Sequence, residues 1–349
     1  MPSYLRFCSS DKTRQQYEQP GHHTSPLRNF KKNLQMKNVK LAIVGAGLMA
    51  REHAKAFADI PEIELVGICS RTRARAETLA QAQGIASVYD SIDDMYRGTQ
   101  ADLVLVAVPE LSAASICEQV FAHPWISLIE KPVGYNVHEA KQLAALAQER
   151  GRRAYVALNR RHYSSTRAVL EEVATIGDQR LVQVFDQENP QVALEGGRSP
   201  LVVENWMYAN SIHIIDYLSV FCRGKVTEVE HVIKWDPKEP RFVLTKVKYS
   251  SGDIGVYQAI WNGPGPWAVT VTTQAKRWEM RPLEQAVSQV YKSRENITVE
   301  VHHWDKEFKP GLRKQAEEAV RAVRGESHDL PSLEEGVETM KLVSSIYAP

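Results

Sequence analysis

Short apolar runs alternate with helix-like patterns over the first half of the chain. The runs place Val, Ile and Leu at consecutive positions, which is typical of strands buried on both faces. They cover residues 39–44, 63–69, 101–109, 126–130 and 154–159. Helical periodicity fills the intervals at 50–59, 73–83, 92–97, 112–122 and 137–149. This alternation predicts right-handed βαβ units, and hence a doubly wound parallel sheet with ligands at the carboxyl ends of its strands.

The pattern changes after residue 160, where apolar and polar residues alternate with a period of two. Such alternation, rich in Val, Thr, Tyr and Trp, predicts antiparallel strands with one open face. The runs lie at 181–187, 226–236, 241–250, 254–262 and 268–280. Ser251-Gly252-Asp253 predicts a hairpin turn between two of them. Helices are predicted at 164–175, 204–221, 311–324 and 333–347, so the second region is α+β.

A glycine turn follows the first strand directly. Gly45, Gly47 and Ala50 occupy the small positions of a G-x-G-x-x-A motif between a strand and a helix. The first position allows a tight turn, the second a close approach to a pyrophosphate, and the third close packing of helix on strand. The helix N-terminus adds unpaired N–H groups and partial positive charge. The context predicts a dinucleotide site rather than an ordinary turn.

The end of the second strand distinguishes NADP from NAD. An Asp or Glu about 20 residues after the glycine turn would hold the ribose 2′-hydroxyl of NAD, but Ser70 and Arg71 stand there. A hydroxyl and a guanidinium suit the 2′-phosphate of NADP, and Arg73 and Arg75 add positive charge. We therefore expect NADP to be preferred over NAD. The alternative is that these arginines form a solvated helix start.

The composition excludes several classes of protein, but it does not identify a substrate. The 349 residues carry 43 basic and 42 acidic side chains, so the net charge of +1 gives no uniform field for nucleic acid or an anionic membrane. No apolar run reaches the length of a membrane span. The four cysteines are scattered, without disulfide or zinc-ligand spacing, which fits a reducing cytoplasm and predicts no metal site. The first 35 residues are polar and aperiodic, and we expect a disordered extension there.

Four motifs in this order resemble the Gfo/Idh/MocA family, named after glucose–fructose oxidoreductase, inositol dehydrogenase and MocA. They are the glycine turn, EKPVG at 130–134, NRRHY at 159–163 and His-x-x-Asp at 213–216, and the stretch 331–343 is similar to the family's last helix. The resemblance implies an NAD(P)-dependent dehydrogenase or reductase acting on the CH–OH group of a sugar, polyol or related alcohol. It also implies an open sheet in the second domain that forms a subunit interface, and hence a homodimer or homotetramer.

The fold expected is thus an N-terminal Rossmann domain followed by an α+β domain with a large, mostly antiparallel open sheet. We assign residues 1–35 to the extension, 36–158 to the Rossmann domain and 159–330 to a substrate and oligomerisation domain. Residues 331–349 are expected to form a helix that packs back on the first domain. The cofactor contacts expected at strand ends are Gly45, Gly47, Leu48, Met49, Ser70, Arg71, Pro109, Glu130, Lys131 and Arg160.

Lys131 is the candidate for proton transfer. Oxidation of an alcohol by hydride transfer requires a group that accepts the hydroxyl proton. Lys131 lies at a strand end before Pro132, and partial desolvation would lower its pKa toward neutrality. Glu130 is expected to position this loop or the lysine. The alternative for Lys131 is an ordinary surface lysine.

His213 is the second catalytic candidate, on the strength of the resemblance. It lies on an apolar helix face, where a histidine is by default a core residue. Asp216 lies one turn later, where it could bond the ring or brace the domain interface. Members of the family commonly carry an Asp four residues before the histidine, but here that residue is Ala209. This departure makes Lys131 the stronger candidate for proton transfer. It also leaves two alternatives for the function, an NAD-dependent glycosidase and a noncatalytic NADP(H)-binding sensor or scaffold.

Polar and aromatic residues are expected to line the substrate side of the cleft. Aromatic faces stack on sugar rings and arginines bind carboxylates or phosphates, so a sugar acid or nucleotide-sugar is a suitable ligand. For Trp206 and Tyr208 the alternative is packing at the domain seam. The substrate-binding candidates are Asn159, Arg161, Tyr163, Trp206, Tyr208, Asn210 and His213.

Overall fold

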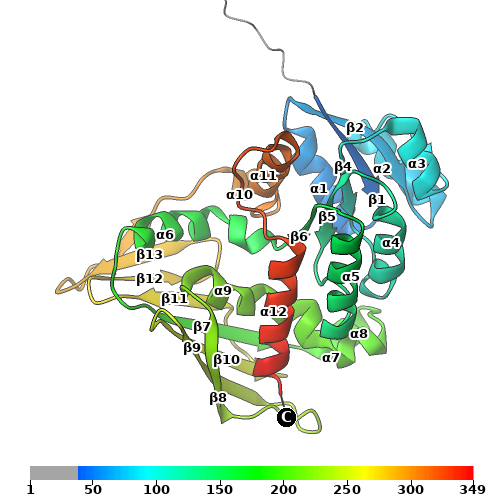
Figure 1. Ribbon diagram of the computed structural model, residues 1–349. Helices are drawn as coiled ribbons and strands as arrows, with labels where there is room; N and C mark the ends of the chain where they lie inside the picture. The colour runs from blue at the N-terminus through cyan, green and yellow to red at the C-terminus, as the bar shows by residue number, and fades with distance from the viewer. Residues whose placement is uncertain (1–37, 349) are drawn as a thin grey trace, which may run out of the picture. The chain divides into compact units, whose positions relative to one another are not determined.

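The computed structural model describes residues 38–348, and these form two sheets with their helices (Figure 1). The extension expected at residues 1–35 lies outside the described residues. Among those described, no helix is both long and apolar enough to cross a membrane.

The first sheet has six parallel strands in the order β3-β2-β1-β4-β5-β6, which confirms the doubly wound Rossmann arrangement. Its strands are β1 (Val39–Val44), β2 (Ile63–Cys69), β3 (Val88–Tyr89), β4 (Leu103–Val106), β5 (Ile126–Glu130) and β6 (Ala154–Ala157). Its helices are α1 (Leu48–Ala58), α2 (Arg73–Gln83), α3 (Ile92–Thr99), α4 (Ala113–Val120) and α5 (Val137–Glu149). Chain order reverses between β1 and β4, where such folds bind ligands.

The strands of this sheet are apolar throughout because both faces are buried. On β1, Leu41 and Ile43 pack with α1 and α2, whereas Ala42 and Val44 pack with α3, α4 and α5. Helix α11 (Leu312–Arg324) also packs on the first of these faces, beside α1. Residues 312–324 thus pack on the Rossmann sheet, although their position in the chain predicts a place in the second domain.

The second sheet has eight strands in the order β14-β13-β12-β11-β7-β10-β9-β8. Only the central pair β7–β10 is parallel, so the prediction of a large, mostly antiparallel sheet is confirmed. The strands are β7 (Leu181–Glu188), β8 (Val226–Ile233), β9 (Phe242–Tyr249), β10 (Ile254–Trp261), β11 (Ala268–Thr272), β12 (Lys276–Met280), β13 (Ala286–Val290) and β14 (Ile297–Val299). β13 was not predicted from the sequence.

One predicted strand is in fact two. The run 268–280 folds back at Thr273, whose hydroxyl accepts hydrogen bonds from the backbone N–H groups of Ala275 and Lys276. Such a turn uses a short polar side chain in place of a strand partner. The period-two pattern continued across this turn, and therefore hid it.

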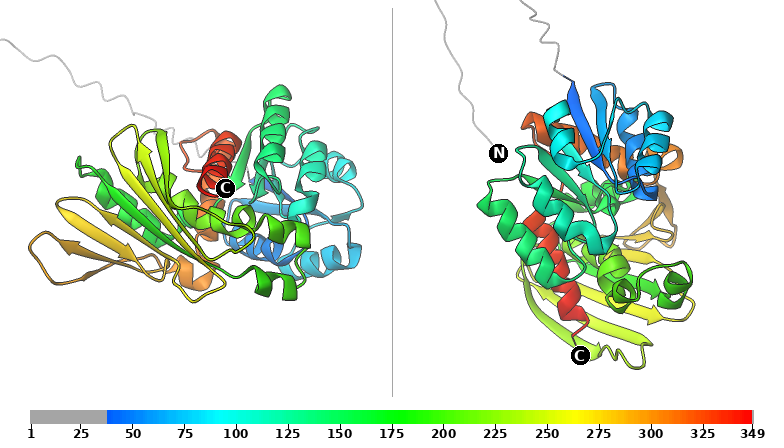
Figure 2. Two further views of the ribbon diagram at one scale, coloured as in Figure 1. Left: turned by 90° about the horizontal axis from the view of Figure 1, so that it is seen from below. Right: turned by 90° about the vertical axis from the view of Figure 1, so that its right-hand side faces the viewer.

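Helices cover one face of the second sheet, as Figures 1 and 2 show for α9 (Ile212–Phe221) and α12 (Leu333–Ile346). The remaining helical segments are α6 (Ser164–Ala174), α7 (Pro190–Glu195), α8 (Pro200–Glu204) and α10 (Trp304–Glu307), with the 3₁₀ turns η1 (Glu110–Ser112) and η2 (Asn159–His162). The helix expected at 204–221 is broken. A π-helical turn, η3 (Met207–Ser211), precedes α9, and such turns often mark functional sites.

Helix α12 runs beside α5 and β6 of the first sheet and α9 of the second (Figure 1). It begins with a capping box between Ser332 and Glu335. At Gly336 a Cβ atom would lie 2.5 Å from Val156 Cγ2, so only glycine allows this approach to β6. The helix therefore contacts elements of both sheets.

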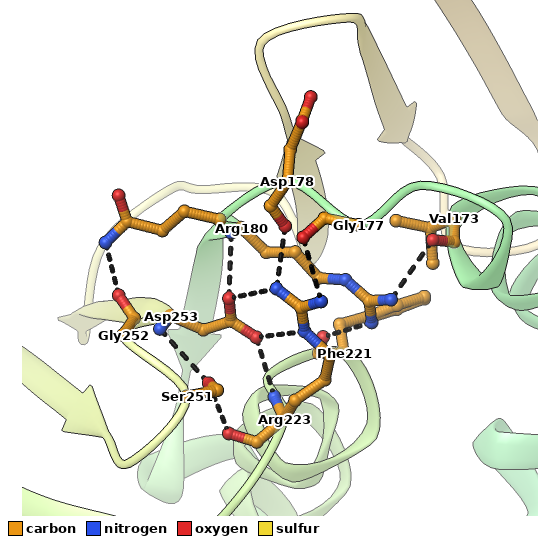
Figure 3. A network of polar contacts seen from close by, with 10 residues as sticks. Val173, Gly177, Asp178, Arg180, Phe221, Arg223, Ser251, Gly252 and Asp253 are labelled. Carbon is orange, nitrogen blue, oxygen red and sulfur yellow. Dashed lines mark hydrogen bonds and ion pairs between the residues drawn. The ribbon is translucent and has the colours of Figure 1, made fainter.

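A buried carboxylate fixes the end of the β9–β10 hairpin (Figure 3). Asp253 is fully buried and accepts hydrogen bonds from the backbone N–H of Arg180 (2.9 Å), the backbone N–H of Arg223 (2.8 Å) and the Arg223 guanidinium (2.8 and 2.9 Å). Burial alone would raise its pKa, but these donors hold the pKa of Asp253 well below its usual range. The carboxylate thereby joins the starts of β7 and β10 to the chain after α9.

We expect Asp253→Asn to lower the free energy of unfolding by roughly 2–4 kcal/mol, because a neutral amide cannot satisfy these donors and Arg223 loses its partner. Since the folded-state pKa is depressed, the wild-type stabilisation is present above the unfolded pKa and is lost as the pH falls below about 4. Urea unfolding at several pH values measures both effects. Asp178→Asn is the control, because Asp178 contacts Arg223 through its backbone carbonyl. Equal stability of the two variants would contradict this account.

Candidate functional site: a cofactor cleft with a side pocket

A cleft of about 940 Å³ lies at the carboxyl ends of the first sheet's strands and extends to α9. All ten residues expected to contact the cofactor line it, from Gly45 to Arg160. Asn159, Asn210 and His213 from the substrate list line it as well. The elements thus bring together residues that are up to 168 positions apart, from Gly45 to His213.

The two glycines of the turn meet different steric conditions. Gly45 has a φ of 110°, and a Cβ there would lie 2.1 Å from the carbonyl oxygen of Ala107. At Gly47 a Cβ would meet no atom within 4 Å, so the N-terminus of α1 is open toward the cleft. No side chain within residues 38–348 caps this helix. An open, uncapped N-terminus fits a phosphate group.

The arginines after β2 differ in their partners. Arg73 pairs with Glu77 and with Asp90, so its charge is neutralised locally. Across the residues that the structure describes, no acidic group lies within ion-pair distance of Arg71 or Arg75, and both line the cleft beside Ser70. Arg71 and Arg75 are therefore the charges available to a ligand.

The end of β5 places Lys131 inside the cleft. Glu130 Oε1 lies 2.6 Å from Nε2 of the buried His53 on α1, which fixes the strand end. Lys131 Nζ donates to the carbonyl oxygen of Ala209 at 2.8 Å, and the Lys131–Pro132 peptide bond is cis. Burial lowers the pKa of Lys131, while the charge of Glu130 opposes this effect. A lysine held this way can lose its proton more readily than a surface lysine.

His213 lines the same cleft from α9. Its Nδ1 is buried and has no hydrogen-bond partner among the described residues. Burial, together with the charges of Lys131 and Arg160, holds the pKa of His213 well below its usual value. A neutral ring has one nitrogen free to accept a hydrogen bond from a ligand.

The carboxylate of Asp216 is bonded to residues other than His213. It accepts two hydrogen bonds of 2.7 Å from Arg161 and one of 2.9 Å from Thr339 on α12. Of the two roles considered for Asp216, the structure favours the bracing of the interface. Arg161 was expected to bind substrate, but the structure pairs its guanidinium with this carboxylate, and Arg161 does not line the cleft.

Three further substrate candidates lie elsewhere. Tyr163 is buried against Gly311, outside the cleft. Tyr208 packs against the apolar core, which is close to the packing role considered as its alternative, and it does not line the cleft. Trp206 also lies outside the main cleft, but it lines a smaller pocket beside it.

This side pocket has a volume of about 480 Å³ and shares Asn210 and Arg198 with the main cleft. Glu188, the last residue of β7, forms part of its wall and accepts hydrogen bonds from Trp206 Nε1 (2.6 Å) and Asn210 Nδ2 (2.9 Å). Trp267 also lines it, with the Arg160 guanidinium 3.9 Å from its ring centroid. Aromatic rings next to amide and carboxyl groups suit a polyhydroxylated ligand.

Sequence reasoning did not single out Glu188, Asp186, Arg198, Trp267 or His53. A signal was present for the two acids. Along β7 the buried positions are Val182, Val184, Asp186 and Glu188, so the period-two pattern places two carboxyl groups on the core face. Carboxyl groups are almost never fully buried without a reason. Nothing in the local pattern marked the other three residues.

Comparison with known proteins agrees with this geometry. Residues 39–158 match the model of the oxidoreductase family with an NAD-binding Rossmann fold. This match covers about a third of the chain, and it identifies residues 39–158 as a Rossmann domain of the Gfo/Idh/MocA family. Its NAD(P)-dependent members include dehydrogenases acting on CH–OH groups.

Two solved structures share the fold. One is a UDP-N-acetylglucosamine 3-dehydrogenase from Acidithiobacillus ferrooxidans, with a TM-score of 0.72, 16% identity and coverage of 90% of this chain and 99% of that one. The other is the WlbA dehydrogenase from Bordetella pertussis in complex with NADH and UDP-GlcNAcA, with a TM-score of 0.69, 18% identity and coverage of 89% and 95%.

Similarity to curated sequences is confined to parts of them. D-apiose dehydrogenase from Paraburkholderia graminis is 28% identical over 116 residues, which cover 33% of this chain and 31% of that protein. The chain spans about a third to just over half of the length of the first curated relatives it matches.

Proposed function

We propose that this protein is an NAD(P)-dependent oxidoreductase that acts on a hydroxyl or keto group of a sugar acid, a nucleotide-sugar or a related sugar. The observation that carries the proposal is one continuous cleft, with an open helix N-terminus at one end and Lys131 and His213 at the other. The first feature suits a dinucleotide, and the second suits proton transfer at a carbinol.

Residues at different places along the cleft have different roles in this proposal. The N–H groups at the start of α1 would hold the pyrophosphate of a dinucleotide, whose nicotinamide would supply the hydride chemistry. Lys131 accepts the hydroxyl proton, since burial lowers its pKa and Ala209 O holds Nζ in place. His213, kept neutral, accepts a hydrogen bond and orients the alcohol. With Ala209 in place of an acid, no His–Asp relay is needed in this scheme.

The choice of an anionic sugar rests on Arg160. It lines the cleft and forms no ion pair among the described residues, and guanidinium groups bind carboxylates and phosphates bidentately. The names of the similar proteins support the class, since they include D-apiose dehydrogenase and a dehydrogenase solved with UDP-GlcNAcA.

We also propose a homodimer or homotetramer, formed through the open face of the second sheet in a cytoplasmic protein. This face exposes apolar side chains of neighbouring strands, including Phe242, Val232 and Ile233. Exposed apolar patches of this kind mark subunit interfaces. A monomeric mass in light scattering at micromolar concentration would contradict the proposal.

The cofactor prediction concerns Arg71. Arg71→Ala is expected to weaken NADPH binding by about 10- to 100-fold and to leave NADH binding unchanged, because a charge-assisted contact to the 2′-phosphate is lost. Fluorescence titration of both cofactors into both proteins measures this. Arg73→Ala is the matched control, since its charge is already paired with Glu77 and Asp90. A wild type that prefers NADH, or equal weakening of both cofactors, would refute the assignment.

The mechanistic prediction ranks Lys131 above His213. With a panel of sugar acids and nucleotide-sugars and absorbance detection of the nicotinamide, Lys131→Ala should lower kcat by about 10²–10⁴-fold, the range for a proton-transfer group. His213→Ala should show a smaller loss in kcat and a higher KM, as for a positioning residue. Both variants should retain cofactor binding, because the glycine turn is intact.

Lys141→Ala, an exposed change on α5, serves as the control. A larger loss in kcat for His213→Ala would reverse the ranking. Near-wild-type turnover by Lys131→Ala would remove the proposed mechanism. Cofactor binding by the wild type without turnover of any sugar would favour a sensor or scaffold instead.

A further inference from the structure

Two carboxyl groups lie on one face of β7 beneath the side pocket, and neither has an ion-pair partner in the part of the chain that the structure describes. Asp186 and Glu188 occupy alternate positions on one face of β7 and are 2% and 1% exposed. Among the ion pairs of residues 38–348, none involves either group. Two unpaired charges this close in a desolvated site are strongly unfavourable.

The hydrogen-bond partners reveal where a proton fits. Glu188 accepts from three neutral donors, Trp206, Asn210 and Ser211. Asp186 Oδ2 accepts from Tyr257 at 2.6 Å, but Asp186 Oδ1 is buried without a partner among the described residues. A buried oxygen without a donor is rare in folded proteins, and a proton between the two carboxyl groups would supply that donor.

We propose that Asp186 and Glu188 share one proton, and that this proton allows the side pocket to accept an anionic group of the substrate. The second part rests on the proposed function. Glu188 lines the pocket that Arg198 and Asn210 join to the main cleft, so its charge acts directly on whatever enters. A doubly ionised pair would repel a carboxylate or phosphate that Arg160 attracts.

The surrounding groups set the direction of the titration. Burial raises the pKa of Glu188 well above its ordinary value, and the charge of Asp186 adds to this effect. Tyr257 on β10 and Tyr347 after α12 are neutral neighbours, since burial and the charge of Asp186 raise both pKa values well above the usual range. His213 is also held neutral.

The nearby cations act in the opposite direction. Arg160 on η2 favours ionisation of Asp186, but its guanidinium lies over Trp267 and forms no ion pair with either acid among the described residues. Arg198, between α7 and α8, is paired with Glu110 across the cleft at 3.0 Å. In the proposed pair one negative charge is therefore left, because burial and the neighbouring charge raise the pKa of Glu188 well above its ordinary value.

Infrared spectroscopy tests the shared proton without any substrate. At neutral pH the wild type should show the C=O stretching band of a protonated carboxylic acid, and the band should titrate away at alkaline pH. Glu188→Gln should abolish the band. Asp186→Asn should shift its loss to lower pH, because the like charge that held the proton on Glu188 is gone.

Glu172→Gln is the matched control. Glu172 also accepts a hydrogen bond from an indole, that of Trp278, but it is paired with Lys276. Although burial would raise the pKa of Glu172, these donors lower it, so its removal should leave the band unchanged. Absence of the band in the wild type at neutral pH, or its persistence in Glu188→Gln, would overturn the proposal. If a variant does not fold, the infrared band of the wild type at neutral pH alone tests whether the two carboxyl groups share a proton.

Kinetics tests the role of the proton. For an anionic sugar substrate, KM of the wild type should rise about tenfold or more through the alkaline titration, with kcat little changed, because only binding of the charged group is affected. In Glu188→Gln, KM should stay flat over the same range. An alkaline rise of KM in both proteins would overturn the role in binding. Failure of the proposed function would instead show as no turnover at any pH, with the infrared result intact.

Discussion

The buried ion pair between Arg161 and Asp216 joins the two sides of the cleft. Arg161 follows β6 of the first sheet, Asp216 lies on α9 over the second, and Thr339 on α12 donates to the same carboxylate. Because Asp216 is almost fully buried, loss of one partner would leave an uncompensated charge, which costs several kcal/mol. The pair therefore fixes α9 relative to the ends of the parallel strands, and with it the separation between the glycine turn and His213.

Sequence alone predicted those parts of the site whose positions depend on local chain geometry. The turn at Gly45 follows from a positive φ and close contact with Ala107, which only glycine tolerates. Arg71 and Lys131 each follow a buried parallel strand, and all such strands end at one edge of the sheet. Their convergence in one cleft therefore follows from the strand pattern, although 60 positions separate them.

The rest depended on partners that are remote in sequence. Arg160 and Arg161 are adjacent and chemically identical, yet one lies over Trp267 and the other binds Asp216. No local pattern separates them, because the choice is made by side chains 55 or more positions away. The break before α9 has the same origin, since Trp206 and Asn210 bond to Glu188 on another element and a π-helical turn results. Helix propensity along the sequence does not predict a break that depends on tertiary contacts.

The contact between Arg198 and Glu110 joins the segment after α7 to the segment after β4, across the mouth of the cleft. Arg198 remains about half exposed, so water screens the pair, and contacts of this kind contribute at most about 1 kcal/mol. That changes the ratio of closed to open mouths by no more than about fivefold. The contact therefore offers little resistance to a ligand that passes the entrance, and its loss removes none of the hydrogen bonds that hold the floor of the site.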